Sequence, residues 1–491
     1  MKMFIKKLFL LTALIAGLVI TPGLKAQTFT TFYSFTNGTD GGNPEYGSLI
    51  LAGNTMYGTT YGGGNAGNGT VFAINTNGMG FTNLYSFTAT AYNNNTGGQT
   101  NSDGANPAAG LILSGNTLYG TTGYGGINAR GTVFAINTDG TGFTNLHTFI
   151  GYPSDGASPT AGLILAGSTF YGTALYGGTN GTGTVFALNT NGMGFTNLYN
   201  FKVQNYDSAI GTSTNSDGAY PVAGLILSGK TLYGTAEYGG ISGVGTVFAV
   251  NIDGTGFTNL HSFTYGLDGA FPYAGLVLSG NNLYGTASAG GSLNKGTVFA
   301  LNTNGTGFTT LHDFTNVLDG YYPKAGLVLS GNTFYGTANG GGHYNSGTVF
   351  ALNTNGMGIT NLYNFAPYVY DPPVFLSTNS SGAHPEAGLL LSGNTLYGTA
   401  YDGGISGYGT VFSLALGSAS ISPPLLTILP SGTNVVLAWT NTASGFNLLF
   451  TTNLVPPAIW STNSTAPVVI NGQNTVTNPI SGTQKFYRLS Q

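Results

Sequence analysis

The sequence predicts an all-β chain in which a seven-bladed β-propeller is followed by a small C-terminal β-sandwich. Three observations support this prediction: a motif repeats seven times, each repeat reads as four short strands, and one strand of the last repeat stands at the start of the chain. No segment shows the apolar period of a helix.

The first 26 residues have the composition of a secretory signal peptide. Lys2, Lys6 and Lys7 precede a short apolar run, and the segment ends at Ala26, a small residue suited to cleavage. The run is shorter than a membrane span needs, and no second apolar segment of that length follows, so we expect no transmembrane segment. Residues 1–26 therefore predict a protein that is secreted, either extracellular or held at the cell surface.

Charged residues make up only 5% of the chain, against roughly a quarter in ordinary globular domains. Without residues 1–26, seven basic and fifteen acidic side chains give a net charge near −8, which argues against nucleic acid as a partner. The chain has no cysteine, so disulfides and thiolate metal sites are excluded. It has no zinc-ligand spacing and no phosphate-binding loop, and we therefore expect no metal and no cofactor.

The repeats are defined by the motif YGT, which recurs at intervals of 51 to 62 residues. Each repeat continues with a glycine pair and then, five residues after the second glycine, with GTVF. Units of this length with constant internal spacing are typical of a propeller, in which each repeat is one blade. In chain order, repeats 1 to 7 carry the motif at Tyr57, Tyr119, Tyr171, Tyr233, Tyr284, Tyr335 and Tyr397.

Each repeat is predicted to contain four strands, as in AGLILSG, NTLYGTT, GTVFAINT and FTNLHTF. The last two alternate with period two, and Val, Ile, Phe, Tyr and Thr dominate all four. The separating sequences SGN, GG, TNG or TDG, and DG are turn-forming. Because the glycines recur in every repeat, we interpret them as turn and packing residues rather than as ligand-binding loops.

Repeat 7 ends after GTVFSL and lacks a fourth strand, whereas FTTFYSF (residues 29–35) stands alone after the signal peptide and matches FTNLYSF (residues 81–87). We therefore expect the N-terminal strand to complete the last blade, to close the ring and to place Phe32 beside Val411. Closure hides strand edges that would otherwise pair with other chains. The propeller is predicted to span residues 27–416, and we expect a monomer.

The motif string LSGNTLYGT…GG…GTVFAINTNG…FTNLHSF resembles the GloVer-type (choice-of-anchor) tandem repeat of secreted bacterial proteins, over roughly residues 28–415. The resemblance implies an exported bacterial β-propeller protein, often with a variable C-terminal sorting or anchoring module. It implies no established activity, so no catalytic residue is carried over from the family.

Residues 417–424 are predicted to be a linker, and residues 425–491 a separate β-sandwich. Strand-like runs such as NVVLAW and GFNLLFTTN alternate with Gly, Pro and Asn, a pattern that resembles fibronectin type III or immunoglobulin-like modules. Trp439 and Trp460 lie in this region and are interpreted as core residues. Sorting, anchoring and binding all stay open as roles for this module.

Three connections between repeats are long and predict a binding face. Each places a Tyr five residues after the last Phe of a fourth strand and ends in TNSDG or STNSSG. In a propeller, these connections emerge on the same face as the loops between second and third strands, where variable tetrads such as INAR, SLNK and HYNS lie. Exposed tyrosine among amides and hydroxyls suits contact with a carbohydrate or a cell-surface protein, although the insertions are alternatively decorative loops. The candidate binding residues are Tyr92, Tyr206, Tyr370, Tyr368, Arg130, Lys295 and His343.

Two glutamates are weak candidates for acid–base chemistry. The residue after the Pro of DGxxP is Glu45 in repeat 1, Lys324 in repeat 6 and Glu386 in repeat 7, and a closed ring makes repeats 1 and 7 neighbours. Two carboxylates at a channel mouth would hold a cation or push their pKa values apart. We favour the simpler interpretation that both are solvated and lie more than a Debye length, roughly 8 Å, apart. We therefore favour a non-enzymatic protein and leave enzymatic activity open.

We interpret the Asp of DGxxP and three of the histidines as structural residues rather than as ligands or catalytic groups. The Asp is expected to cap a turn by accepting local backbone N–H bonds, since a calcium site needs several converging oxygens. His147, His261 and His312 stand where other repeats have Tyr and are interpreted as packing residues, and His384 has no assignable partner. The Asp recurs at Asp40, Asp103, Asp155, Asp217, Asp268 and Asp319, with Ser381 in repeat 7.

These observations predict a secreted or cell-surface binding or scaffold protein that uses one propeller face for carbohydrate or surface-protein recognition. One alternative is a polysaccharide hydrolase or lyase that uses Glu45 and Glu386. The other is a purely structural envelope component.

Overall fold

The computed structural model describes residues 27–315, 318–371, 376–417, 426–431, 433–440, 447–453, 460–463, 465–470, 473–479 and 485–490. Their regular structure consists of strands alone, and no helix that is long and apolar enough to cross a membrane is found among them. The predicted signal peptide and nearly all of the predicted linker lie outside these residues.

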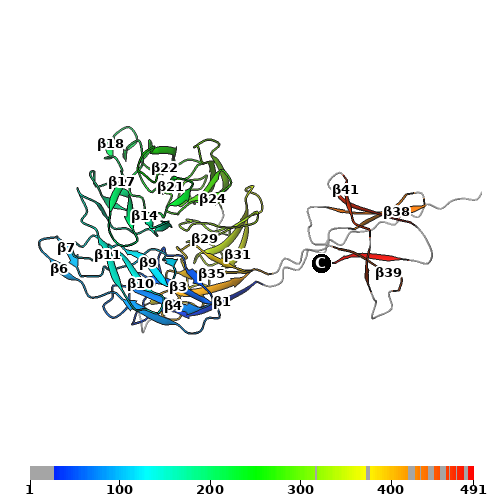
Figure 1. Cartoon of the computed structure of the whole chain (residues 1–491), viewed down its shortest axis with the longest axis horizontal. Coiled ribbons are helices and arrows are strands. Elements are labelled where there is room, and N and C mark those ends of the chain that lie inside the picture. The colour runs from blue at the N-terminus through cyan, green and yellow to red at the C-terminus, as the bar shows by residue number, and fades with distance from the viewer. Residues whose placement is uncertain are drawn as a thin grey trace, which may run out of the picture. The chain divides into compact units, whose positions relative to one another are not determined.

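The described residues belong to two compact units, a large one spanning Thr28–Ala415 and a small one within Leu416–Gln491. The large unit contains seven four-stranded antiparallel sheets arranged around a common centre, a propeller-like fold (Figure 1). Six sheets follow chain order, and the seventh combines three strands of repeat 7 with the first strand of the chain.

The strands of these sheets match the four predicted segments of each repeat. Repeats 1 to 3 form β2 (Ile50–Ala52), β3 (Thr55–Thr60), β4 (Thr70–Asn75) and β5 (Thr82–Ser86); β8 (Ile112–Ser114), β9 (Thr117–Thr122), β10 (Thr132–Asn137) and β11 (Thr144–Thr148); and β13 (Ile164–Ala166), β14 (Thr169–Ala174), β16 (Thr184–Asn189) and β17 (Thr196–Asn200). Repeats 4 to 6 form β20 (Ile226–Ser228), β21 (Thr231–Ala236), β22 (Thr246–Asn251) and β23 (Thr258–Ser262); β24 (Val277–Ser279), β25 (Asn282–Ala287), β26 (Thr297–Asn302) and β27 (Thr309–Asp313); and β28 (Val328–Ser330), β29 (Thr333–Ala338), β30 (Thr348–Asn353) and β31 (Thr360–Asn364). The seventh sheet is formed by β34 (Leu390–Ser392), β35 (Thr395–Ala400), β36 (Thr410–Ala415) and β1 (Thr28–Ser34).

Four additional strand pairs lie in the connections between these strands. The three long insertions each fold as a hairpin, and a fourth, two-residue pair joins the DG segment of repeat 3 to its glycine pair. They are β6 (Ala91–Asn93) with β7 (Gly98–Thr100), β18 (Asn205–Asp207) with β19 (Thr212–Thr214), β32 (Val369–Asp371) with β33 (Leu376–Thr378), and β12 (Gly156–Ala157) with β15 (Tyr176–Gly177).

The glycine of YGT is required by packing within each sheet. In repeat 1, Gly58 pairs with Phe72 of the GTVF motif, and a Cβ at Gly58 would lie 2.6 Å from Phe72 Cζ. The phenyl ring therefore lies across the glycine, and the same distance recurs in the other six repeats. This contact explains why YGT and GTVF are repeated together.

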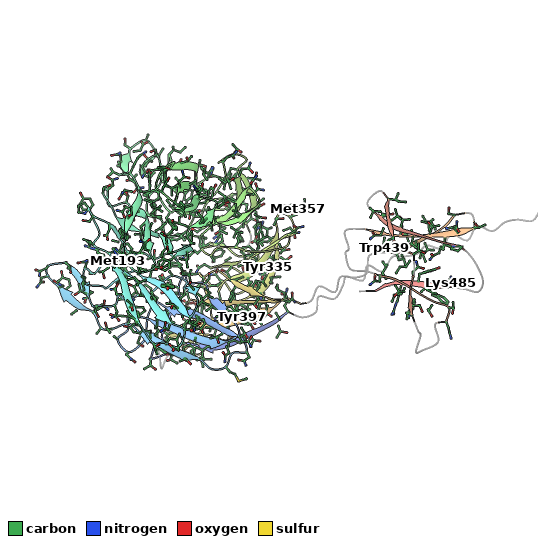
Figure 2. The ribbon with its side chains drawn as sticks, viewed as in Figure 1. Met193, Tyr335, Met357, Tyr397, Trp439 and Lys485 are labelled. Atoms are coloured by element: carbon green, nitrogen blue, oxygen red, sulfur yellow. The ribbon has the colours of Figure 1, made fainter. Side chains whose placement is uncertain are left out.

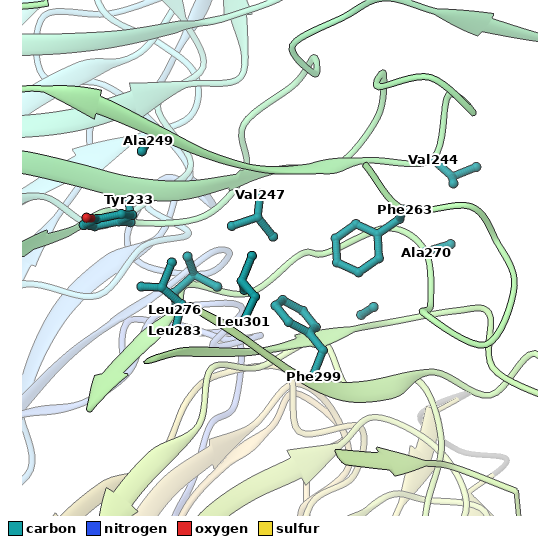
Figure 3. Close-up of a cluster of buried hydrophobic side chains, with 11 residues drawn as sticks. Tyr233, Val244, Val247, Ala249, Phe263, Ala270, Leu276, Leu283, Phe299 and Leu301 are labelled. Atoms are coloured by element: carbon teal, nitrogen blue, oxygen red, sulfur yellow. The ribbon is translucent and has the colours of Figure 1, made fainter. Parts of the chain in front are cut away.

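The hydrophobic core lies between neighbouring sheets (Figure 3). Tyr233, Val247 and Phe263 of repeat 4 pack against Leu276 and Phe299 of repeat 5. Val247, Phe263 and Phe299 are fully buried. Each sheet thus buries both of its faces against its neighbours, and no sheet has a core of its own.

Strand β1 pairs antiparallel with β36, and Tyr33 lies opposite Val411. A register shift between Thr31 and Tyr33 leaves Phe32 next to this pair. The Tyr33 ring stacks on Phe81 of repeat 1 with the ring centroids 3.9 Å apart. Because Tyr85 stacks on Phe143 in the same way at 4.0 Å, β1 makes the contact to the next sheet that a fourth strand makes elsewhere.

Main-chain hydrogen bonds link each repeat to the one before it. The residue before the DGxxP proline has a positive φ and donates its N–H to the preceding repeat's tetrad loop, as Asn106 does to Asn68 O at 2.8 Å. Asn43 of repeat 1 donates in the same way to Tyr408 O of repeat 7 at 2.7 Å. The linked pairs are Asn43–Tyr408, Asn106–Asn68, Ser158–Arg130, Tyr220–Thr182, Phe271–Val244, Tyr322–Lys295 and His384–Ser346.

A buried threonine adds a second link at six of these junctions. Thr235 Oγ1, for example, donates to Ala274 O at 3.1 Å. Repeat 1 has one extra residue between Pro44 and Leu49 compared with the corresponding segments. The equivalent Thr399 of repeat 7 is 2% exposed, and its hydroxyl has no hydrogen-bond partner among the described residues. The junction of repeats 7 and 1 therefore lacks this bond.

The small unit contains two antiparallel sheets. The four-stranded sheet has the order β37 (Thr427–Ser431), β38 (Asn434–Thr440), β42 (Gln473–Pro479), β41 (Val468–Ile470), and the three-stranded sheet has the order β40 (Ser461–Thr462), β39 (Asn447–Thr451), β43 (Phe486–Ser490). Trp439, labelled in Figure 2, is 2% exposed and packs with Leu437 and Leu448. Trp460 was expected to be a core residue, but it is only half-buried, and its ring centroid lies 4.3 Å from the Arg488 guanidinium.

The threonine links give a paired stability prediction. Thr235→Val leaves the buried Ala274 carbonyl unpaired and should lower the free energy of unfolding by about 1–3 kcal/mol. Thr399→Val removes a hydroxyl that has no partner and should leave the unfolding free energy unchanged or raise it. Denaturant unfolding of both variants measures the difference, and equal losses would contradict the distinct seventh junction.

Candidate functional site

A pocket of about 620 Å³ lies at the centre of the large unit. All seven repeats line it with the segment that runs from the DGxxP proline into the first strand. In repeats 2 to 4 these segments present Ala, Gly, Thr, Val and Leu, whereas repeats 5 to 7 present Tyr273, Lys324 and Glu386. The pocket is therefore apolar on the side of repeats 2 to 4 and polar on the side of repeats 5 to 7.

Small residues leave this central space open. Gly162 and Gly224 lie where the inner segments approach one another, and a Cβ at Gly224 would be 3.2 Å from Gly162 O. A glycine occupies this position in repeats 2 to 7, and Ser48 takes its place in repeat 1. Close backbone packing thus forms the wall, and the pocket's chemistry depends on the few larger side chains beside it.

Glu386 and Lys324 form an ion pair in the pocket. Lys324 Nζ lies 2.8 Å from Glu386 Oε1, and Asn339 Nδ2 donates to the same oxygen at 2.9 Å. Glu386 is 9% exposed. The expectation of a solvated Glu386 is therefore wrong, because the carboxylate is buried and repeat 6 supplies both of its partners.

Glu45 is half-buried, and the charge of Glu386 acts on its carboxyl. Burial, followed by the charge of Glu386, raises the pKa of Glu45 to about 7, and a hydrogen bond from Tyr46 and the charge of Lys324 oppose the rise. Repeats 1 and 7 lie side by side through β1 and the Asn43–Tyr408 link, and the charge of Glu386 therefore acts on the Glu45 carboxyl. Repeats that are far apart in sequence thus bring together two carboxyls with different environments.

Glu237 is a third carboxyl at the pocket, and it was not among the predicted residues. It is 6% exposed, and its pKa is raised by burial and lowered in part by hydrogen bonds from Tyr273 and Tyr238. Glu237 follows the second strand, at a position that varies between repeats as the position of Glu45 does. Comparing this second variable position across the repeats would have found it.

A continuous row of aromatic side chains, which we call the aromatic rim, reaches the pocket at Tyr238, whose hydroxyl hydrogen-bonds to the pocket residue Glu237. Neighbouring ring centroids along it are 5.3–5.9 Å apart. All of its rings are partly exposed, and Tyr176 reaches 47%. The aromatic rim consists of Tyr176, Tyr220, Tyr238, Phe271 and Tyr265, in that order.

The rim was missed because its members come from three kinds of position, each of which has other residue types in other repeats. Tyr176 and Tyr238 lie in the glycine-pair loops, and Tyr220 and Phe271 precede the DGxxP proline. Only folding places these positions next to one another, so no stretch of sequence shows the row.

The predicted tyrosines of the insertions lie on the three hairpins. Tyr92 on β6 and Tyr206 on β18 are 64% and 71% exposed. Tyr370 is opposite Ser377 in the β32–β33 pair, and its side chain is outside the described part. The hairpins lie against the tetrad loops, as expected, since a Cβ at Gly98 would meet Ala129 Cβ at 2.6 Å.

The remaining predicted binding residues have mixed environments. Arg130 and His343 are exposed, and Lys295 Nζ lies 4.4 Å from the Tyr321 ring centroid. Tyr368 is half-buried and contacts His384 Nδ1 at 2.9 Å through its hydroxyl. His384 also pairs with Asp402 at 3.0 Å, which raises the pKa of the imidazole, so His384 does have a partner. The hydrogen bond to His384 thus holds the Tyr368 side chain within the connection between repeats 6 and 7.

The Asp residues of DGxxP accept backbone N–H bonds, as expected for turn caps. Asp155 accepts from the N–H groups of Ile150 and Gly151, both at 2.7 Å. It also lies 3.0 Å from His147 Nε2, and His147 stacks on Phe195 at 4.1 Å. The histidine therefore packs, as interpreted, and in addition bonds to the cap. No group of three or more His, Asp or Glu that could hold a metal ion is found in the described part of the chain.

Comparison with known proteins identifies a repeat family. The profile of the Gloeobacter/Verrucomicrobia repeat matches residues 98–219 and 206–412. No curated protein sequence matches the chain significantly.

Solved structures with similar folds are remote in sequence. An oligogalacturonate lyase in complex with manganese has 10% identity and a TM-score of 0.48, over 80% of this chain and 97% of that one. An oligogalacturonate lyase from Vibrio parahaemolyticus has 9% identity and a TM-score of 0.43, over 80% and 98% of the two chains. A nidogen/laminin complex has 14% identity and a TM-score of 0.34, over 54% and 78%. Likenesses this distant carry no information about activity.

The coupling of the two glutamates predicts a change in titration. Glu386→Gln should lower the pKa of the Glu45 carboxyl below about 7, because it removes a neighbouring negative charge. ¹³C NMR titration of the glutamate carboxyl carbons measures the shift, with Glu45→Gln identifying the signal. Asp139→Asn, which changes a fully exposed carboxyl, is the control. A Glu45 titration unaltered by Glu386→Gln would show that the two groups are not coupled.

The same raised pKa has a consequence for stability. Native Glu45 keeps its proton up to about pH 7, whereas the unfolded chain releases it near 4.5. The free energy of unfolding should therefore fall as the pH rises through this window. Glu45→Gln removes the penalty, so it should raise Tm at pH 8 and leave Tm unchanged at pH 4.

Proposed function

The chain belongs to the Gloeobacter/Verrucomicrobia repeat family, and we propose that it is an exported carbohydrate-binding protein built on a closed seven-bladed β-propeller. The binding site is the polar side of the central pocket together with the aromatic rim. The single observation that carries the proposal is the contiguous row of partly exposed rings beside a pocket of about 620 Å³.

Ring closure is supported by equivalent links between all neighbouring repeats. The N–H to O=C link recurs seven times, and the pair Asn43–Tyr408 joins repeat 1 to repeat 7. The stacks of Tyr363 on Phe29 at 3.7 Å and of Tyr33 on Phe81 at 3.9 Å attach β1 to the sheets on both sides. In this proposal the first strand of the chain clasps the last blade.

Export is proposed from residues 1–26, whose basic start, apolar run and terminal Ala26 have signal-peptide character. The net charge near −8 of the chain without residues 1–26 suits a monomer and disfavours a nucleic acid partner. The small unit would then be an anchoring or sorting module.

Carbohydrate is the preferred ligand because of the chemistry of the site. Aromatic rings supply apolar area for the C–H faces of sugars, and hydroxyl, amide and carboxylate groups supply direction. Tyr176 and Tyr238 offer the first, and Asn339, Glu237 and Glu386 offer the second. A surface protein with exposed sugars presents the same chemistry.

A second candidate function is cleavage of a polysaccharide at this site. It is favoured by one observation: Glu45, with a pKa raised to about 7, is coupled to Glu386, which Lys324 holds in an ion pair. Carboxyls in such different environments are typical of acid–base pairs. Release of new sugar ends from a bound polymer, lost in Glu45→Gln, would distinguish a hydrolase or lyase from a binding protein.

Glycan-array binding of the purified chain, followed by calorimetry on the glycans bound, tests the proposal. Tyr176→Ala combined with Tyr238→Ala should weaken binding about tenfold or more, since aromatic contacts of this kind contribute about 0.5–1.5 kcal/mol each. Met193→Ala combined with Met357→Ala is the matched control, because these exposed side chains lie in the loops between third and fourth strands (Figure 2).

The outcomes separate the possible sites. Binding to no glycan would reject the proposed function. Loss of binding only with Tyr92→Ala and Tyr206→Ala would move the site to the insertion hairpins, and loss with the Met control would indicate a nonspecific surface.

A further inference from the structure

The polar side of the pocket carries more negative than positive groups. Glu237 and Glu386 line it, the charge of Glu386 also acts on Glu45, and Lys324 is the single lysine or arginine among the residues that line the pocket. His384 and Asp402 form a neighbouring pair of opposite charge, which leaves the imbalance unchanged when His384 is protonated. With Glu237 and Glu386 ionised and Glu45 protonated, the site has one uncompensated negative charge, and ionisation of Glu45 adds a second.

The pocket already surrounds one ammonium group with carboxylates. Lys324 Nζ bonds to Glu386 Oε1 at 2.8 Å, and its charge also acts on Glu45 and Glu237. Glu386 is saturated by Lys324 and Asn339 at this oxygen. Glu45 and Glu237 instead accept hydrogen bonds from tyrosine hydroxyls, which are neutral donors that a ligand cation can supplement or displace.

Tyrosines lie between these carboxylates. Tyr46 interacts with both Glu45 and Glu386, and Tyr273 interacts with Glu237 and Glu386. Burial and the adjacent carboxylates raise the pKa of both phenols, so both hydroxyls stay protonated at neutral pH. Aromatic rings combined with carboxylates are the surroundings that attract organic ammonium groups. Tyr61 and Tyr401 border Glu45 as well.

We propose that this pocket binds a ligand ammonium group, so that the preferred ligand is a glycan with free, unacetylated amino groups. The inference rests on the proposed carbohydrate-binding function. The sugar rings lie along the aromatic rim, and one protonated amine enters the pocket beside Glu237. An N-acetylated sugar lacks the charge and adds an acetyl group at the same atom.

A bare metal cation fits the site less well. No set of three or more His, Asp or Glu ligands converges within the described ranges of the chain, and a hard cation needs several oxygens at one point. An ammonium group needs only separate acceptors around it, and the carboxylates of this pocket are arranged in that way.

Calorimetry with two matched oligosaccharides tests the inference: glucosamine oligomers and N-acetylglucosamine oligomers of equal length, at pH 6, where the amines are protonated. The intact chain should bind the free-amine oligomer about tenfold more tightly, and added salt should reduce this preference, as for a charge-dependent contact. Glu237→Gln should abolish the preference. Asp207→Asn, which removes an exposed carboxylate on hairpin strand β18, should leave it intact.

Each result has a distinct meaning. Equal affinity for the two oligomers, tighter binding of the acetylated one, or an equal loss of preference in Asp207→Asn would overturn the ammonium site while leaving carbohydrate binding in place. Binding of other glycans but of neither oligomer would also overturn it. Binding to no glycan at all would reject the proposed function itself. If Glu237→Gln does not fold, Glu386→Gln provides the second variant, with the same expected loss of preference, because it leaves the positive charge of Lys324 uncompensated.

Discussion

The antiparallel pairing of β1 with β36 is the interaction on which the rest of the account depends. It places the first strand of the chain beside repeat 7, and the Tyr33–Phe81 stack then holds repeat 1 against the same sheet. Glu45 and Glu386 come from opposite ends of the repeat array and interact only because these ends are adjacent. The polar side of the pocket is thus a product of this one strand pairing.

The repeats supply a uniform frame, and the site arises where single repeats depart from it. Six junctions share a threonine hydrogen bond, and the inner segments share a glycine. The position of Lys324 and Glu386 is Ala108 in repeat 2 and Val222 in repeat 4, so the backbone of this position tolerates any of these side chains. Charged residues at such a position are not required by the repeat, and they cost stability when buried unless they are paired. They are the basis of the proposed binding site.

The fold was largely predictable because each repeat carries its own turn and strand signals. YGT, the glycine pair and GTVF mark the strands, and the displaced FTTFYSF run indicated the pairing of β1. The capping role of Asp155 also followed from sequence. The three insertions were recognised as long connections, but their folding as hairpins was not predicted. What sequence left open was how far side chains of different repeats enclose one another. Glu386 was taken as solvated, although Lys324 and Asn339 of the preceding repeat cover it, and Glu237 was missed.

Amide hydrogen exchange of β1 in the intact chain is the most direct test of this account. If β1 closes the ring, the amides of Thr28–Ser34 that pair with β36 should exchange as slowly as those of β5, the equivalent strand of repeat 1. Exchange of these amides at the rate of an unprotected terminus, with β5 still protected, would contradict closure. The proximity of Glu45 and Glu386 at the pocket, which depends on the contact of repeats 1 and 7, would then have no structural basis.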